Sequence, residues 1–219
     1  MRDTRYSIIS RRGLVAGGLA ALPALALAVG ALAAGPKVVT ILGDSITAGL
    51  GLPGREALPN QLHLALEQLR VPNIVRGAGI SGDTTADGLG RLAFSIAPDT
   101  AVVVVALGGN DLLQGLDPTR TRANLDKIIR RLKAEHKGVV LCGISAPAEI
   151  GAGYAKAFNA VFPALARQHH VAFYPNLLAG VERRPALLQG DGLHPNARGV
   201  QIIAHRLAPV VAKVLKAQR

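Results

Sequence analysis

The sequence predicts an α/β domain in which helices cover both faces of a five-stranded parallel sheet. Short apolar runs alternate along the chain with longer segments of helical periodicity. Aromatic residues make up only 3% of the chain and Trp is absent, so Ala, Val, Leu and Ile must fill the interior, as they do in buried parallel sheets. A chain of 219 residues with 49% hydrophobic residues can bury one core of this kind.

The elements follow one another in βα order. The predicted strands are 37–42, 73–78, 101–106, 138–144 and 171–174. The predicted helices are 60–70, 84–95, 119–136, 154–170 and 197–213. No repeat or Pro- or Ser-rich linker divides residues 34–219, which we interpret as one domain. Right-handed βα crossovers give a parallel sheet with helices on both faces. Ligands bind to such sheets beyond the carboxyl ends of the strands, so functional residues are expected just after strands.

Residues 1–33 are predicted to be an export signal. The pair Arg11-Arg12 precedes a mildly apolar run of Ala, Leu and Gly that ends in a small-x-small cleavage pattern at Ala33. Paired arginines favour the twin-arginine route over Sec, and they predict a periplasmic or secreted protein. A retained anchor is the alternative, because residues 13–35 are about long enough to span a bilayer.

Charge and cysteine content limit the function classes. The formal net charge is +11; four arginines and one aspartate before Ala34 contribute +3, which leaves +8 for the remainder. Those cations are spread along the chain, which favours solvated helix faces over a nucleic-acid site. Cys142 is the only cysteine, so an intramolecular disulfide is impossible, and no zinc-ligand spacing occurs. We expect neither a metal nor a cofactor.

The first strand runs into Gly43-Asp44-Ser45, which places Ser45 in a tight turn at the sheet's carboxyl edge. A nucleophile placed there has small neighbours, and the backbone N–H groups after the strand are free to bind negative charge. The alternative is an ordinary turn with Ser45 as a helix N-cap.

A carboxylate and an imidazole stand three positions apart in the loop before the last helix, at Asp191 and His194. A Ser hydroxyl needs a base to take its proton, and the base needs a partner that orients its ring. Asp191 and His194 can fill both roles. The other histidines lie within or beside predicted helices, where no such role is expected: His63, His136, His169, His170 and His205.

Two further Gly-rich segments follow strands, 77–85 after the second and 107–111 after the third. The backbone N–H of Gly82 and the side-chain amide of Asn110 can donate to a developing oxyanion without transferring a proton. Taken singly, each segment is only a turn, in which Asp83 or Thr84 would serve as an N-cap.

Together the four segments resemble the GDSL, or SGNH, hydrolases, and within them the small secreted arylesterases, lysophospholipases and acyl thioesterases. The resemblance spans 37–217 and implies a three-layer, flavodoxin-like fold. It assigns the nucleophile to Ser45, the oxyanion glycine to Gly82, the oxyanion amide to Asn110, and the remaining triad members to Asp191 and His194. Related sequences often have Asn where this chain has Gly77, which puts the support of neighbouring loops in question.

The resemblance implies a monomeric serine esterase that hydrolyses carboxylic esters or thioesters through an acyl-Ser45 intermediate, with the Ser45 N–H as a further oxyanion donor. Segments 111–118 and 145–154 are expected to line the acyl pocket. The candidate substrate contacts are Leu112, Leu113, Leu116, Ala146, Ala148 and Ile150. Membrane contact is expected only through the signal segment or a lipid substrate. The alternatives are a polysaccharide O-deacetylase and a non-catalytic envelope protein that binds lipid or glycan on the same scaffold.

Overall fold

Five parallel strands pair in the order β2-β1-β3-β4-β5, which is the flavodoxin-like order. They are β1 (Lys37–Gly43), β2 (Asn73–Gly79), β3 (Thr100–Ala106), β4 (Gly138–Cys142) and β5 (Ala172–Tyr174). The structure is a computed structural model that describes Met1 and residues 35–218; the predicted export signal falls almost wholly outside the described residues. The predicted parallel α/β sheet is confirmed.

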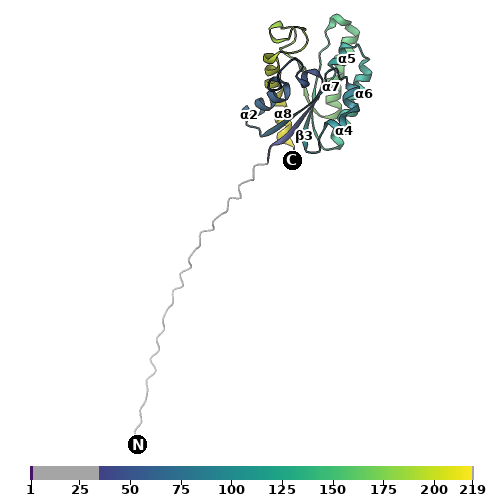
Figure 1. Ribbon diagram of the computed structural model, residues 1–219. Helices are drawn as coiled ribbons and strands as arrows, with labels where there is room; N and C mark the ends of the chain where they lie inside the picture. The colour runs from purple at the N-terminus through teal and green to yellow at the C-terminus, as the bar shows by residue number, and fades with distance from the viewer. Residues whose placement is uncertain (2–34, 219) are drawn as a thin grey trace. The chain divides into compact units, whose positions relative to one another are not determined.

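Helices cover both faces of this sheet (Figure 1). One face carries α2 (Leu58–Gln68) and α8 (Ala197–Ala217). The other carries α3 (Thr85–Gly90), α4 (Leu92–Ser95), α6 (Pro118–Ala134) and α7 (Ala152–His169). Each strand serves both layers because its side chains alternate: in β3, Val102 and Val104 pack under α8, whereas Val103 and Val105 pack under α6 and α7.

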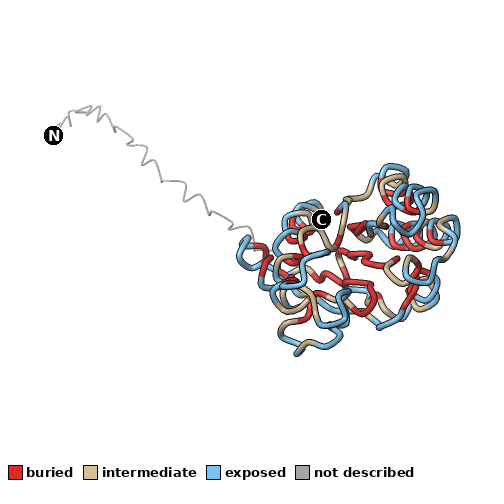
Figure 2. The backbone as a smooth tube through the Cα atoms, turned by 90° about the horizontal axis from the view of Figure 1, so that it is seen from above, coloured by how far each residue is buried: buried red, intermediate tan, exposed pale blue. Residues whose placement is uncertain are grey.

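The helices form where the sequence supplies caps and an apolar stripe. Asp117 accepts a hydrogen bond from the Thr119 N–H at the start of α6, and Pro118 takes the first helical position, which needs no N–H. The stripe of α6 that faces the sheet is fully buried and consists of Leu125, Ile128, Ile129 and Leu132. Figure 2 shows the result for the whole domain, with buried residues lining the interior and exposed residues on the outer sides of the helices.

Three local predictions differ from the structure. The predicted helix 84–95 is two short helices, α3 and α4, which part at Arg91 after a segment that includes Gly88 and Gly90, poor helix formers. Single-turn helices replace two predicted turns, at α1 (Ser45–Ala48) and α5 (Gly109–Leu113). Three 3₁₀ turns, at Gly54–Glu56, Ala148–Ile150 and Pro185–Leu187, lie outside every predicted helix and strand.

The ends of β1, β2 and β3 are in register, and this alignment brings three separate segments together. Gly43 pairs with Gly79 on one side and with Ala106 on the other. A Cβ at Gly43 would collide with the Thr47 hydroxyl, so α1 can fold back over the strand end only where glycine stands. The segments after the three strands therefore begin at the same edge.

Candidate active site

Ser45 is the first residue of α1 and is almost completely buried, with 8% of its surface exposed. The helix is capped by the preceding residue: the Asp44 carboxylate accepts the Ile46 N–H at 3.1 Å. The alternative in which Ser45 itself caps the helix is therefore wrong. Because Asp44 performs the capping, the Ser45 hydroxyl is free to contact another group.

The Ser45 hydroxyl contacts His194, and His194 contacts Asp191. Ser45 Oγ lies 2.8 Å from His194 Nε2, and His194 Nδ1 lies 2.6 Å from Asp191 Oδ2. A carboxylate can only accept, so Nδ1 carries the proton and Nε2 presents a lone pair to the hydroxyl. This arrangement can take a proton from Ser45 Oγ and hold it on the ring.

The loop that carries Asp191 and His194 keeps the carboxylate ionised. Asp191 Oδ1 accepts the backbone N–H groups of Leu193 at 2.9 Å and His194 at 3.0 Å. These bonds, led by the His194 N–H and followed by its ring N–H, lower the pKa of Asp191 to about 2. The His194 carbonyl accepts the Gln189 N–H at 2.8 Å, which ties the loop to the segment before it.

Gly82 and Asn110 line the same cavity as Ser45 and His194. Gly82 has a φ of +90°, which favours glycine, and no atom lies within 4 Å of where its Cβ would stand. Asn110 lies in the first turn of α5 and donates one amide N–H to the Asp83 carbonyl at 2.9 Å. The amide has two N–H donors, so one remains to bind a substrate oxygen.

A buried carboxylate that the sequence reasoning missed connects these two segments. Asp111 is 1% exposed and accepts three hydrogen bonds. They come from the Thr85 N–H at 2.8 Å, the Thr85 hydroxyl at 2.5 Å and the Thr121 hydroxyl at 2.9 Å. Asp111 thereby holds the start of α3, next to Gly82, against the helix that carries Asn110. The sequence feature that could have identified Asp111 is its position directly after Asn110 in a Gly-rich segment.

Arg91 was also missed, and it braces the same region from the other side. Its Nε contacts Asp83 Oδ2 at 2.5 Å, and its Nη2 donates to the Gly43 carbonyl at 2.9 Å. One guanidinium therefore joins the end of β1 to the segment that contains Gly82. The ion pair is largely shielded from solvent, with side-chain exposures of 17% and 11%.

Asp44 places a second carboxyl group beside the Ser45–His194 pair. It is 4% exposed, and burial raises its pKa to about 6, against the opposing effects of the Ile46 N–H and the nearby His194. Its Oδ2 lies next to Gly109 at the start of α5. The group therefore changes charge in the pH range in which an imidazole titrates.

The cavity has a volume of about 720 Å³ and a largely apolar wall. Its apolar side chains include Leu50, Leu112, Leu113, Ile150 and Leu193. Of the expected substrate contacts, Leu112, Leu113 and Ile150 therefore lie in the wall. The segment after β5, which the sequence reasoning missed, adds further wall residues: Asn176, Leu178, Glu182, Arg183 and Leu188.

Leu116, Ala146 and Ala148 lie outside this wall. Leu116 ends the turn after α5, where its N–H bonds to the Asp111 carbonyl. Ala146 is 4% exposed and packs in the core cluster with α6 and α7, and the Asn159 amide bonds its N–H at 2.7 Å and its carbonyl at 2.9 Å. Ala148 is exposed on the 3₁₀ turn Ala148–Ile150.

Gly77, where related sequences often have Asn, is closely packed. A Cβ at this position would lie 2.7 Å from Pro59 Cγ in α2. The proline therefore fills the space that a side chain at position 77 would need.

Comparisons with known proteins agree with this geometry. A family model described as "GDSL-like Lipase/Acylhydrolase family" matches residues 41–202. Esterase TesA of Pseudomonas aeruginosa is 38% identical over 172 residues, which cover 78% of this chain and 86% of TesA. Thioesterase 1/protease 1/lysophospholipase L1 of Escherichia coli strain K12 is 36% identical over 177 residues, which cover 80% of this chain and 84% of the relative.

A solved structure extends the agreement to the fold. AlinE4, described as an SGNH-hydrolase family esterase, superposes with a TM-score of 0.69 at 39% identity, covering 81% of this chain and 96% of that one. The chain therefore belongs to the GDSL-like lipase/acylhydrolase family and is an ester-bond hydrolase with the SGNH-hydrolase fold.

Proposed function

We propose that this chain is a serine esterase that hydrolyses carboxylic esters or thioesters of acyl-chain substrates through an acyl-Ser45 intermediate. The observation that carries the proposal is the continuous contact from Ser45 Oγ through His194 to the ionised Asp191, at 2.8 Å and 2.6 Å. The relatives' names, which include esterase, thioesterase and lysophospholipase, support the same reaction class.

In the first half-reaction, Ser45 Oγ attacks the carbonyl carbon while its proton moves to His194 Nε2. The Asp191 carboxylate holds the ring by Nδ1 and stabilises the imidazolium that forms. His194 then gives the proton to the departing alkoxide or thiolate, and the acyl group stays on Ser45. In the second half-reaction, water attacks the acyl-enzyme with the same base, and the acid leaves.

Each tetrahedral intermediate carries a negative oxygen that needs donors. Ser45 opens a helix, and the first N–H groups of a helix have no acceptor within it. The N–H of Ser45, the N–H of Gly82 and the second amide N–H of Asn110 are the donors that we assign to this oxygen. The hydrogen bond from Asn110 to Asp83 supports this role because it fixes the amide before substrate arrives.

The apolar wall favours a substrate with an acyl chain. Leu112 and Leu113 follow the Asn110 segment, and Ile150 lies on the segment after β4. A cavity of about 720 Å³ is large enough for a chain of several carbons, and apolar contact is the main source of affinity for such a group.

We propose that the enzyme acts in the periplasm or outside the cell, on the basis of the Arg11-Arg12 pair and the apolar run that follows it. Within the described residues, no helix is long and apolar enough to cross a membrane. We also propose that the protein contacts a membrane only through the export segment or through a lipid substrate.

A fluorophosphonate probe tests the proposal directly, because it labels a Ser only where a base activates the hydroxyl. We expect rapid labelling of the full chain, peptide mapping of the adduct to Ser45, and no labelling of Ser45→Ala. Ser95→Ala is the matched control, since Ser95 lies in α4 and bonds to Arg91. A folded protein that resists the probe would support the non-catalytic binder instead.

A substrate panel then separates the enzymatic alternatives. p-Nitrophenyl esters graded by chain length, an acyl thioester and an acetylated sugar should be compared by kcat/KM. The apolar wall predicts a rise in kcat/KM from acetyl to longer chains, because each buried CH₂ contributes about 0.8 kcal/mol. A preference for the acetylated sugar would indicate an O-deacetylase.

A further inference from the structure

A second cavity, of about 470 Å³, lies between α8 and the segment that follows β5. Its wall carries three arginines and a histidine and no carboxylate: Arg184, Arg198, Arg206 and His205. None of these residues contributes to the wall of the ester cavity. The two cavities are therefore chemically different, one largely apolar and the other basic.

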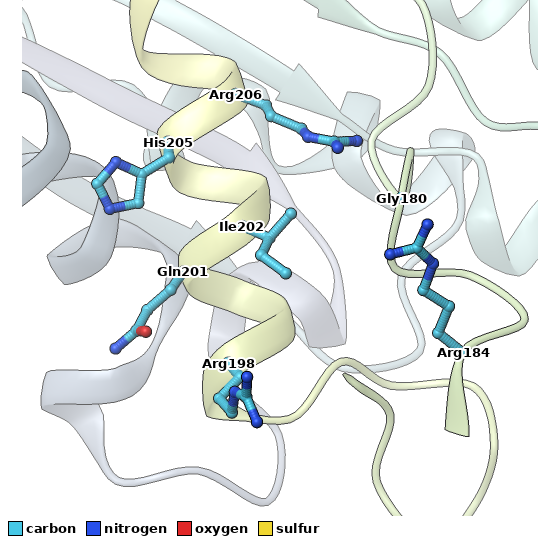
Figure 3. A pocket seen from close by; sticks show the side chains of 7 residues that line it. All are labelled: Gly180, Arg184, Arg198, Gln201, Ile202, His205 and Arg206. Atoms are coloured by element: carbon cyan, nitrogen blue, oxygen red, sulfur yellow. The ribbon is translucent and has the colours of Figure 1, made fainter. Parts of the chain in front are cut away.

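The cationic groups come from two different parts of the chain. Arg198, Ile202 and Arg206 are spaced four residues apart and so form one stripe along α8. Figure 3 shows Ile202 and Arg206 projecting toward the segment that carries Gly180, and the Arg184 guanidinium turned into the same gap from the opposite side. Gln201 and His205 project from the other side of the helix.

One of these arginines is already fixed in place. Arg206 Nη1 donates to the Ala179 carbonyl at 2.6 Å, and its guanidinium lies where a side chain at Gly180 would otherwise stand. This bond uses one of the five N–H donors of the group, so the rest can face a ligand. The charge of Arg206 is thus held at the cavity without a carboxylate partner.

Within residues 35–218, no carboxylate lies within 4.0 Å of the charged groups of Arg184, Arg198 or Arg206. The nearby Glu182 carboxylate accepts from the Asn176 amide at 2.8 Å and its side chain belongs to the ester cavity. Several like charges around one hollow raise its potential and attract an anion.

We propose that this basic cavity is a binding site for a phosphate group carried by a small ligand or by a lipid headgroup. Planar guanidinium groups match the oxygens of phosphate with paired hydrogen bonds, and a doubly charged anion gains most from several cations. The cavity exceeds what one phosphate fills and lies within the range of about 300 to 1,000 Å³ typical of small-molecule sites. Ile202 offers the rest of the ligand an apolar contact.

The basic cavity shares a wall with the ester cavity. Gly180 and Arg184 face the basic cavity, whereas Glu182 and Arg183, between them in sequence, face the ester cavity. The binding site does not depend on the proposed esterase function, because none of its residues touches Ser45, His194 or Asp191. Its test is a binding measurement and does not require turnover.

The test is calorimetric titration of the full chain with inorganic phosphate against chloride at constant ionic strength. Arg184→Gln and Arg198→Gln should each weaken phosphate binding by about tenfold or more, because each removes a charge-assisted contact. Arg120→Gln, which removes an exposed arginine on α6, should bind as the parent does. Arg206 is left intact because it also holds the Ala179 segment.

Vesicle binding distinguishes a soluble phosphate-bearing ligand from a lipid headgroup. Ether-linked phosphatidylglycerol in phosphatidylcholine resists ester hydrolysis and is compared with phosphatidylcholine alone. Binding of free phosphate that Arg184→Gln weakens assigns a soluble ligand. Binding of anionic vesicles alone, again weakened by Arg184→Gln and Arg198→Gln, assigns a lipid headgroup. No binding of either probe, or equal binding by the parent and both variants, overturns the site.

Discussion

Asp111 accepts both the backbone N–H and the hydroxyl of Thr85, at 2.8 Å and 2.5 Å. The two residues stand 26 positions apart, and this double contact joins the start of α3 to α5. Gly82 lies just before α3, and Asn110 lies within α5. The relative position of the two proposed oxyanion donors therefore depends on a carboxylate that contacts neither of them through its side chain.

Asp111→Asn should lower both stability and turnover. The amide offers one acceptor where three donors now point at a carboxylate, so at least one donor loses its partner in a buried site. We expect a loss of about 1 to 3 kcal/mol in the free energy of unfolding. We also expect kcat to fall by a larger factor than KM rises when both are measured well below the melting temperature of the variant. Asp126→Asn, which removes the partner of His169 and Arg130, is the control for lost stability with unchanged kcat.

Asn110→Ala should lose turnover without losing substrate affinity. The amide would meet a full negative charge in the tetrahedral intermediate but only a weakly polar carbonyl in the bound ester. Removing such a donor lowers kcat by about a hundred- to a thousandfold, with little change in KM. Steady-state kinetics and thermal unfolding should be measured together, with Asn60→Ala, an exposed amide that bonds to Gly54, beside them. Full activity, or a loss explained by unfolding alone, contradicts the assignment.

Asp191→Asn and His194→Ala should fold as the parent does and hydrolyse esters about a thousandfold more slowly or worse, because Ser45 loses its oriented base. Purified variants should be compared by kcat and by circular dichroism. Asp99→Asn, which breaks an exposed pair with Arg76, should retain parental kcat. Near-parental turnover in His194→Ala would require a different base.

The raised pKa of Asp44 predicts a pH dependence of stability with a definite sign. The Asp44 carboxyl group has a pKa of about 6 in the folded chain against an ordinary value of 3.8. Its contribution to the free energy of unfolding is therefore fully present below pH 3.8 and is lost as pH rises through 6. A difference of two pKa units corresponds to about 3 kcal/mol. The pKa of Asp191 is lowered to about 2, so the pH dependence has the opposite sign. The stabilisation by the ionised Asp191 is lost only as pH falls from 3.8 through 2.

Asp44→Asn keeps the oxygen that caps α1 but cannot ionise. We therefore expect its free energy of unfolding to fall less than the parental value between pH 4.5 and pH 7.5. Urea unfolding at both pH values, for parent and variant, measures the difference. Parallel changes in the two proteins would show that Asp44 does not titrate in this range.

Replacing both Arg11 and Arg12 with Lys should trap precursor in the cytoplasm, because the twin-arginine route reads the arginine pair and not only its charge. Fractionation of cells that express the parent and the double variant measures the effect. Normal export of the variant would assign the chain to Sec.

The sequence predicted the sheet and the paired residues of the last loop for local reasons. Apolar runs identify strands, and Asp191 and His194 lie close enough in the chain for one loop to bring them together. The register of the parallel strands explains the place of Ser45. The strands end at one edge of the sheet, and Ser45 therefore lies beside that loop.

The wall of the cavity was harder to predict because its residues depend on distant contacts. Leu116 and Ala146 were chosen for their place in a segment, but Leu116 lies in the turn after α5 and Ala146 packs in the core cluster with α6 and α7. The segment after β5 shows no helical or strand periodicity of apolar residues. Its position beside the cavity is determined by contacts with residues far away in the sequence. One is the bond of 2.8 Å from Gln189 Nε2 to the Leu50 carbonyl, 139 positions away.

One part of the cavity wall stands on a strand end that carries none of the reacting groups. Ser45, Gly82 and Asn110 follow β1, β2 and β3, and Asp191 and His194 follow β5, whereas Ile150 stands on the segment after β4. That segment can therefore be exchanged without replacing a reacting group. Transplanting residues 144–151 from a related enzyme offers an engineer a route to a new acyl preference that leaves the bond-breaking groups where they are.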